Sequence, residues 1–125
     1  MSTIAAIAAA AKAAAIPPAL LLSVCFTESG FRNTLSPTDG KSASYGVCQV
    51  KLATARMFNP KVHASTLMNP KVNAMYAAIY LKYQLRRYGY DVRRAVCAYN
   101  SGSHYYPNRG CAYSDRVLGR VRQYE

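Results

Sequence analysis

Helical periodicity of the apolar residues runs along nearly the whole chain, and it restricts the fold more than any other feature of the sequence. After Pro17-Pro18, a pair typical of a first helical turn, Leu21, Cys25 and Glu28 fall on one helix face, and Gly30 marks the end of that helix. The same reasoning predicts helices over residues 3–15, from Pro18 to Gly30, over residues 46–58, from Pro70 to Gly89, after a cap at Asp91, and after a cap at Ser114 or Asp115.

Two polar segments interrupt this pattern. Residues 31–45 are rich in Ser, Thr, Gly, Asp and Pro, so they predict a loop or small hairpin, and residues 101–112 predict a loop. A length of 125 residues, of which 51% are hydrophobic, suits one compact domain because the apolar material is sufficient for one core. We therefore expect a mostly α single domain over residues 1–125.

The N-terminal segment is apolar but is not typical of a secretory signal. A signal has a basic region before its apolar stretch, whereas Met1-Ser2-Thr3 has no basic side chain and Lys12 interrupts the stretch. A transmembrane helix needs about 20 uninterrupted apolar residues, which this segment lacks. We interpret residues 3–15 as an Ala-rich helix of the mature protein, with a cleavable signal as the alternative.

The net charge of +11, from sixteen Lys and Arg residues against five Asp and Glu, favours an anionic partner. The candidates are nucleic acid, an anionic membrane face and cell-envelope polymers. No DNA-reading motif is present, so we do not expect a specific nucleic-acid partner. The basic residues form two clusters, at Lys82, Arg86, Arg87, Arg93 and Arg94, and at Arg109, Arg116, Arg120 and Arg122.

The cysteines lie far apart in the chain and form no CxxC pair, so we expect neither zinc nor another metal or cofactor. Cys25, Cys48 and Cys97 each lie in an apolar run, which favours buried structural thiols. A disulfide between Cys97 and Cys111 stays open, because spacing alone does not decide it.

Glu28 is the residue that most directly indicates chemistry. It shares the apolar helix face with Leu21 and Cys25, directly before a polar loop. Burial disfavours the charged form, so we expect the pKa of Glu28 to rise. A carboxylic acid that is protonated near neutral pH suits glycosidic bond cleavage, because the leaving oxygen must receive a proton. The alternative is a structural glutamate that pairs with one of the arginines.

Several short motifs occur in a set order around Glu28. Together they resemble the soluble lytic transglycosylase family of peptidoglycan-cleaving enzymes, and the resemblance covers roughly residues 16–122. It implies a lysozyme-like, mostly α fold with a substrate cleft. The motifs are ESGF at 28–31, GVCQV at 46–50, ATA at 53–55, AYNSG at 98–102 and YSDRVL at 113–118, with Asn73 and Tyr80-Leu81 between.

The resemblance implies roles residue by residue. Glu28 matches the single catalytic acid and base of the family, and Tyr113 matches a late tyrosine whose hydroxyl reaches toward that acid. Cys48 stands where the family usually has Met. Substrate-binding positions are implied at Ser29, Ser36, Gln49, Tyr99, Asn100 and Tyr113.

Nine of the eleven tyrosines form two groups. Five fall in or beside predicted loops, where a ring can stack on a sugar face: Tyr45, Tyr99, Tyr105, Tyr106 and Tyr113. We add Tyr45 to the substrate-binding candidates. Four are expected to pack within helices: Tyr76, Tyr80, Tyr83 and Tyr88.

The resemblance further implies a mechanism with one carboxylate. Glu28 protonates the glycosidic oxygen, the N-acetyl group of the substrate stabilises the charge at C1, and the muramoyl C6 hydroxyl then attacks to form a 1,6-anhydro sugar. A hydrolase usually supplies a second carboxylate. Asp39 in the polar loop is the candidate for that role, although Asp39-Gly40 also fits an ordinary turn, which we favour.

The sequence thus predicts a monomeric lytic transglycosylase that cleaves the MurNAc-GlcNAc β-1,4 bond of peptidoglycan glycan strands without a cofactor. One alternative is a hydrolytic muramidase that uses Glu28 with Asp39. Another is a basic nucleic-acid-binding or structural virion module on an inactive lysozyme-like fold. We expect a phage lysis or virion-associated enzyme, or a secretion-system enzyme, that is made in a host cytoplasm and acts in the periplasm or cell wall. Its basic face would contact anionic envelope polymers or a membrane surface.

Overall fold

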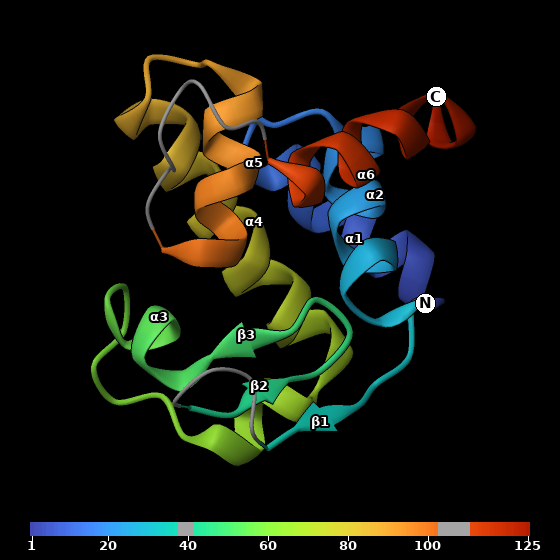
Figure 1. Cartoon of the computed structure of the whole chain (residues 1–125). Helices are drawn as coiled ribbons and strands as arrows, with labels where there is room; N and C mark the ends of the chain where they lie inside the picture. The colour runs from blue at the N-terminus through green and yellow to red at the C-terminus, as the bar shows by residue number, and fades with distance from the viewer. Residues whose placement is uncertain (38–41, 103–110) are drawn as a thin grey trace.

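The computed structural model describes residues 1–37, 42–102 and 111–125. Three short strands, β1 (Leu35–Ser36), β2 (Ser44–Tyr45) and β3 (Val50–Lys51), form an antiparallel sheet in that order. The architecture is mostly α and lysozyme-like, which confirms the predicted fold class (Figure 1). The helical elements are α1 (Thr3–Ala13), α2 (Pro18–Ser29), α3 (Leu52–Arg56), η1 (Ala64–Met68), α4 (Pro70–Arg87), α5 (Val92–Ser101), α6 (Ala112–Arg120) and η2 (Val121–Tyr124).

Local capping signals explain where several helices begin and end. The Asn69 side chain accepts hydrogen bonds from the backbone N–H groups of Lys71 and Val72 at the start of α4, and Asp91 accepts one from Arg94 at the start of α5. Gly30 ends α2 in the left-handed conformation, with φ of +66°. These ends confirm the predictions made at Pro70, Asp91 and Gly30.

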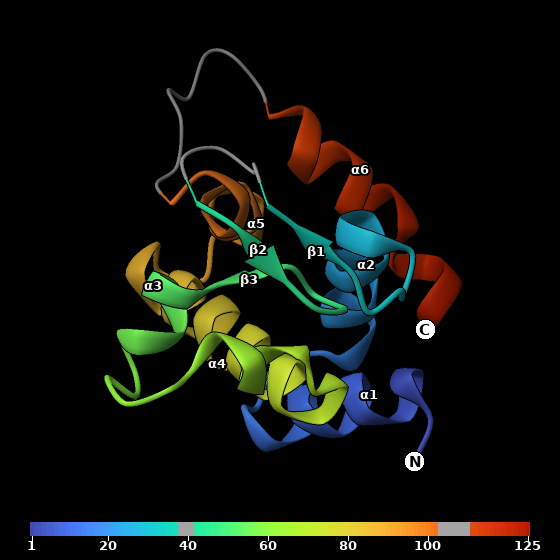
Figure 2. The same ribbon diagram turned by 90° about the horizontal axis from the view of Figure 1, so that it is seen from below.

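The helices and the sheet occupy different parts of the molecule. Figure 1 shows α1, α2, α5 and α6 on one side, the sheet and α3 on the other, and α4 extending between them. α4 packs against α1 and α5, while α2 packs against α1 and α6 (Figure 2). The Ala-rich helix α1 forms within the range predicted for it, and it buries Ile7 and Ala11 completely in the core. No helix in the described ranges is long and apolar enough to cross a membrane.

The helix predicted over residues 46–58 is wrong in its first half. Residues 46–49 form a turn, β3 follows, and only Leu52–Arg56 is helical. Gly46 has φ of +81°, and a Cβ at this position would lie 2.7 Å from the Leu67 carbonyl oxygen. The close approach of η1 and α4 therefore forces a turn where the local periodicity favours a helix.

The cysteines form disulfides, so the prediction of buried thiols is wrong in its chemistry, although Cys25 and Cys48 are buried as expected. The bond between Cys25 and Cys48 joins α2 to the turn before β3, with an S–S distance of 2.04 Å. Cys97 and Cys111 form the second disulfide, the pairing that the sequence left open. Spacing could not predict the first bond because its two cysteines meet only through tertiary packing.

The predicted cap of the last helix is also wrong. α6 begins at Ala112 after Cys111, so Ser114 and Asp115 lie inside its first turns. The Ser114 hydroxyl donates to the Arg93 carbonyl oxygen at 2.6 Å, and Asp115 pairs with the Arg93 guanidinium. Both side chains bind α5 instead of capping their own helix, because α5 and α6 pack together.

Candidate active site

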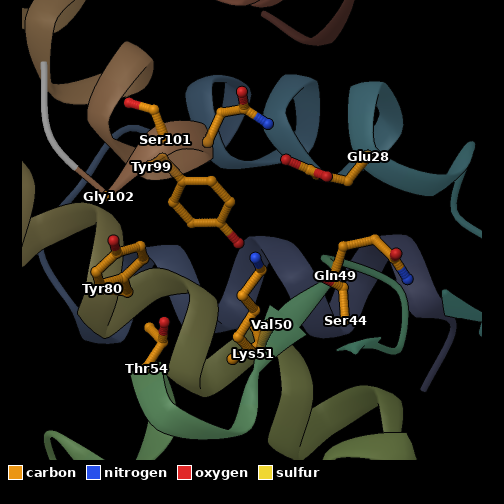
Figure 3. Close-up of a pocket in the computed structure, with 11 residues that line it drawn as sticks. Glu28, Ser44, Gln49, Val50, Lys51, Thr54, Tyr80, Tyr99, Ser101 and Gly102 are labelled. Atoms are coloured by element: carbon orange, nitrogen blue, oxygen red, sulfur yellow. The ribbon is translucent and has the colours of Figure 1, made fainter. Parts of the chain in front are cut away.

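A pocket opens between the end of α2, the sheet, α3, the middle of α4 and the end of α5 (Figure 3). Its wall combines one carboxylate, one ammonium and several hydroxyl and amide groups, which suits a polar ligand with many oxygen atoms. The lining residues are Glu28, Ser44, Gln49, Val50, Lys51, Thr54, Tyr80, Tyr99, Asn100, Ser101 and Gly102.

Glu28 lies in the last turn of α2, half-buried at one end of the pocket. Its Oε2 accepts a hydrogen bond from the Tyr113 hydroxyl at 2.5 Å. Burial, and then the negative charge of Glu28, raises the pKa of Tyr113 well above its ordinary value. Tyr113 therefore remains protonated near neutral pH and acts as a donor that stabilises the carboxylate form of Glu28.

Tyr99 connects α5 to the turn before β3. Its hydroxyl donates to the Cys48 carbonyl oxygen at 2.9 Å, and burial together with the charge of Glu28 raises the pKa of Tyr99 well above its ordinary value. The Tyr99 ring also contacts Tyr80, with centroids 5.3 Å apart. Tyr99 is thus a neutral, fixed part of the pocket wall.

Gln49 is held in place by its own amide. Its Nε2 donates to the carbonyl oxygens of Thr34 at 3.0 Å and Gly46 at 2.9 Å, and its backbone has φ of +52°. Within the described part of the chain, its Oε1 accepts no hydrogen bond. Gln49 therefore presents a carbonyl oxygen with a fixed position to a ligand in the pocket.

Asn73 holds this turn from behind. It is fully buried on α4, and its Oδ1 accepts the Cys48 N–H at 2.8 Å. Its Nδ2 donates to the carbonyl oxygens of Tyr45 at 2.6 Å and Leu67 at 2.8 Å. Three hydrogen bonds from one side chain fix the path of the backbone that carries Gln49.

The remaining predicted substrate-binding residues are placed differently. Asn100 is exposed and lines the pocket, whereas the buried Ser29 hydroxyl donates to the Val47 carbonyl oxygen at 2.6 Å and so joins α2 to the turn. Ser36 and Tyr45 lie on β1 and β2, on strands next to the pocket but outside its lining. Their contacts with substrate stay predictions. Asp39, Tyr105 and Tyr106 lie outside the described residues.

Several lining residues were not among the predicted site residues. Tyr80 was expected to pack within a helix, and it does so with only 9% of its surface exposed, yet it also lines the pocket. Thr54, Ser101 and Gly102 fall inside the ATA and AYNSG motifs, which could have identified them. Ser44 and Lys51 carried no such signal, and they reach the pocket because β2 and β3 pair with Ser44 opposite Lys51.

The arrangement suits proton transfer to and from a ligand by a single carboxylate. Among the residues that the structure describes, Glu28 is the only acid that lines the pocket. Asp91 and Asp115 pair with arginines on the surface, away from this wall. A half-buried carboxylate with a fixed neutral donor can both give and take a proton.

Comparison with protein families agrees with this geometry. A family model described as the Transglycosylase SLT domain matches residues 5–109, a range that contains Glu28, Gln49, Tyr99 and Asn100. Tyr113 lies beyond the matched range, and the structure places its hydroxyl against Glu28, where the sequence resemblance predicted it. A search of curated proteins finds no match.

Proposed function

Because the chain belongs to the SLT transglycosylase domain family, we propose that it cleaves the MurNAc-GlcNAc β-1,4 bond of peptidoglycan. The lytic cleavage of peptidoglycan is the activity of that family, and Glu28 would act here first as the acid and then as the base. The observation that carries this proposal is the hydrogen bond between Tyr113 and Glu28 at the end of the pocket. This hydrogen bond orients the Glu28 carboxyl group and supplies a donor that stabilises its ionised form.

In the first step, protonated Glu28 transfers its proton to the glycosidic oxygen, and the bond between that oxygen and C1 of the muramoyl sugar breaks. Positive charge develops at C1, and the N-acetyl oxygen of the same sugar stabilises it. Glu28 becomes a carboxylate in this step, so the donor hydroxyl of Tyr113 favours the transition state over the ground state.

In the second step, the C6 hydroxyl of the muramoyl sugar attacks C1 and closes a 1,6-anhydro ring. The proton of that hydroxyl passes to the Glu28 carboxylate, which restores the acid for the next cycle. No water is consumed. Gln49 and Asn100 would orient the amide and hydroxyl groups of the substrate, and the rings of Tyr80 and Tyr99 would contact the sugar faces.

Product analysis tests the reaction. Purified peptidoglycan treated with the protein is expected to give 1,6-anhydromuramoyl ends by mass spectrometry. Reducing muramoyl ends as the main product would replace this proposal with a hydrolytic muramidase that uses Asp39. Glu28→Gln should lower the rate by roughly 10²–10⁴, the usual contribution of general acid–base catalysis, and turnover close to wild type would refute the assignment of the acid.

We further propose that the protein acts in the periplasm or cell wall, after production in a host cytoplasm, during phage lysis or penetration of the envelope. The two disulfides support an oxidising compartment as the place of action. A basic face would concentrate the enzyme on anionic envelope polymers or a membrane surface. A groove on α4 supports this, since Lys82, Arg86 and Arg87 line it together with Phe58 and Tyr83.

A further inference from the structure

The proposed reaction leaves one charged group of the pocket without a role. Lys51 ends β3, pairs with Ser44 across the sheet, and lies directly before α3, so its backbone is held on both sides. Its half-buried side chain reaches from the sheet into the pocket, and its nitrogen lies on the side of the Tyr99 hydroxyl (Figure 3). The fold therefore sets the position of the backbone that carries this ammonium, and the side chain faces the pocket.

Lys51 has no carboxylate partner in the part of the chain that the structure describes. The ion pairs found there join Arg93 to Asp115 and Arg94 to Asp91, and no hydrogen bond from the Lys51 side chain is present. Other cations contribute to the fold: Arg120 donates to the Thr27 hydroxyl, and Lys82 donates to the Ala15 carbonyl oxygen. Lys51 forms no such contact with the residues that the structure describes, so among them its half-buried ammonium has no role in holding the fold together.

The chemistry of the proposed substrate offers a partner. A glycan strand of alternating GlcNAc and MurNAc is neutral except at the substituent of the muramoyl sugar. That substituent ends in a lactyl carboxylate where the peptide is missing, and in the carboxylates of the stem peptide where it is present. A cation inside the pocket therefore distinguishes muramoyl units from neutral sugars.

We propose that Lys51 is a specificity-determining residue that binds a carboxylate of the muramoyl substituent. The inference rests on the proposed function, because it takes peptidoglycan as the substrate. Thr54 lines the same pocket three residues further along and adds a hydroxyl donor to that wall, so two oxygen atoms of a carboxylate have two kinds of donor near them. Partial burial strengthens the attraction relative to a charge pair in open solvent.

Binding by a catalytically inactive background tests this role. Calorimetry at a fixed, low ionic strength would compare three glycans on Glu28→Gln: chitohexaose, a peptide-free muramoyl glycan and a peptide-bearing strand. Adding Lys51→Gln should weaken binding of a carboxylate-bearing glycan about five- to tenfold more than it weakens binding of chitohexaose. This factor is the one expected for the loss of a partly buried charge pair. Adding Lys51→Arg should retain most of that affinity because the charge remains. The muramoyl ligand that shows the loss identifies the carboxylate as lactyl or peptide.

Lys71→Gln is the matched control, since it removes one positive charge from an exposed lysine that does not line this pocket. An equal loss for all three glycans, the same loss in Lys71→Gln, or a Lys51→Arg variant as weak as Lys51→Gln would overturn the inference. So would a background protein that binds no carboxylate-bearing glycan. The wild-type digest of peptidoglycan tests the proposed function separately, because it can yield anhydro products whether or not Lys51 selects a carboxylate.

Discussion

Tyr113→Phe removes one hydroxyl group and keeps the ring in its place. The Tyr113 side chain is 6% exposed, and its hydroxyl donates to Glu28 at 2.5 Å. A hydrogen bond to a charged group contributes about 1.5–3 kcal/mol. Because Glu28 is half-buried and water can replace part of the contact, we take the lower end. A loss of about 1.5 kcal/mol in the transition state lowers kcat by about tenfold.

The pH dependence separates this effect from a structural one. The Tyr113 hydroxyl stabilises the ionised form of Glu28, so its removal favours the protonated acid. Glu28 must be protonated to start the reaction, and the alkaline limb of kcat/KM should therefore move to higher pH in Tyr113→Phe. A variant that merely loosened the fold would not shift this limb.

The assay measures initial rates of anhydro-product release from purified peptidoglycan across pH, at fixed low salt. Tyr76→Phe is the matched control, since Tyr76 is also 6% exposed and its hydroxyl oxygen also takes part in a hydrogen bond, which it accepts from Asn59. Tyr76 does not line the pocket. The control should keep the wild-type rate and profile. A Tyr113→Phe variant with an unchanged rate and an unchanged alkaline limb would refute the role of this hydroxyl.

Three further perturbations follow from the structure. Gly46→Ala should lower thermal stability and activity together, because a Cβ at this position meets Asn73 and the Leu67 carbonyl oxygen. Gly89→Ala is also at positive φ but in open space, so it should lower the free energy of unfolding by only about 1 kcal/mol. Equal melting temperatures for the two variants would contradict the packing argument. Replacing Cys25 and Cys48 together by Ala should lower the free energy of unfolding, measured by chemical denaturation, by about 3 kcal/mol, because this disulfide closes a loop of 23 residues. Unchanged stability would show that packing alone holds α2 to the turn. If Asp39 only shapes a turn, Asp39→Asn should reduce the rate on peptidoglycan by less than about tenfold, which corresponds to about 1.4 kcal/mol of activation free energy. A loss as large as that of Glu28→Gln would identify water as the nucleophile.

Local signals were sufficient for the elements that carry the proposed catalytic carboxylate. Pro18 at the start of α2, its apolar face and Gly30 at its end placed Glu28 in the last turn next to a polar segment, as the structure has it. Pro70 and Asp91 likewise predicted the starts of α4 and α5. Such predictions succeed because a cap or a helical stripe depends on residues within a few positions of each other.

The aromatic and polar wall of the pocket was only partly predictable. Tyr99 and Asn100 were expected there from the AYNSG motif, and both line the pocket. Tyr80 shows why a helical pattern does not decide whether a residue packs in the core or lines a pocket. A residue on the buried face of a helix can do both. Nothing in the sequence distinguishes Lys51 from a surface lysine. It lines the pocket because β2 pairs with β3.

The sequence by itself determined the helical class, the main helix ends and the position of Glu28 beside a polar segment, because each rests on neighbours along the chain. Only the tertiary structure decided that residues 46–51 form a turn and a strand and that Cys25 bonds to Cys48. Each of these depends on segments that are distant in the chain and meet in the core. Local propensity is weak beside the steric and hydrogen-bonding requirements of such a contact, so packing overrides it.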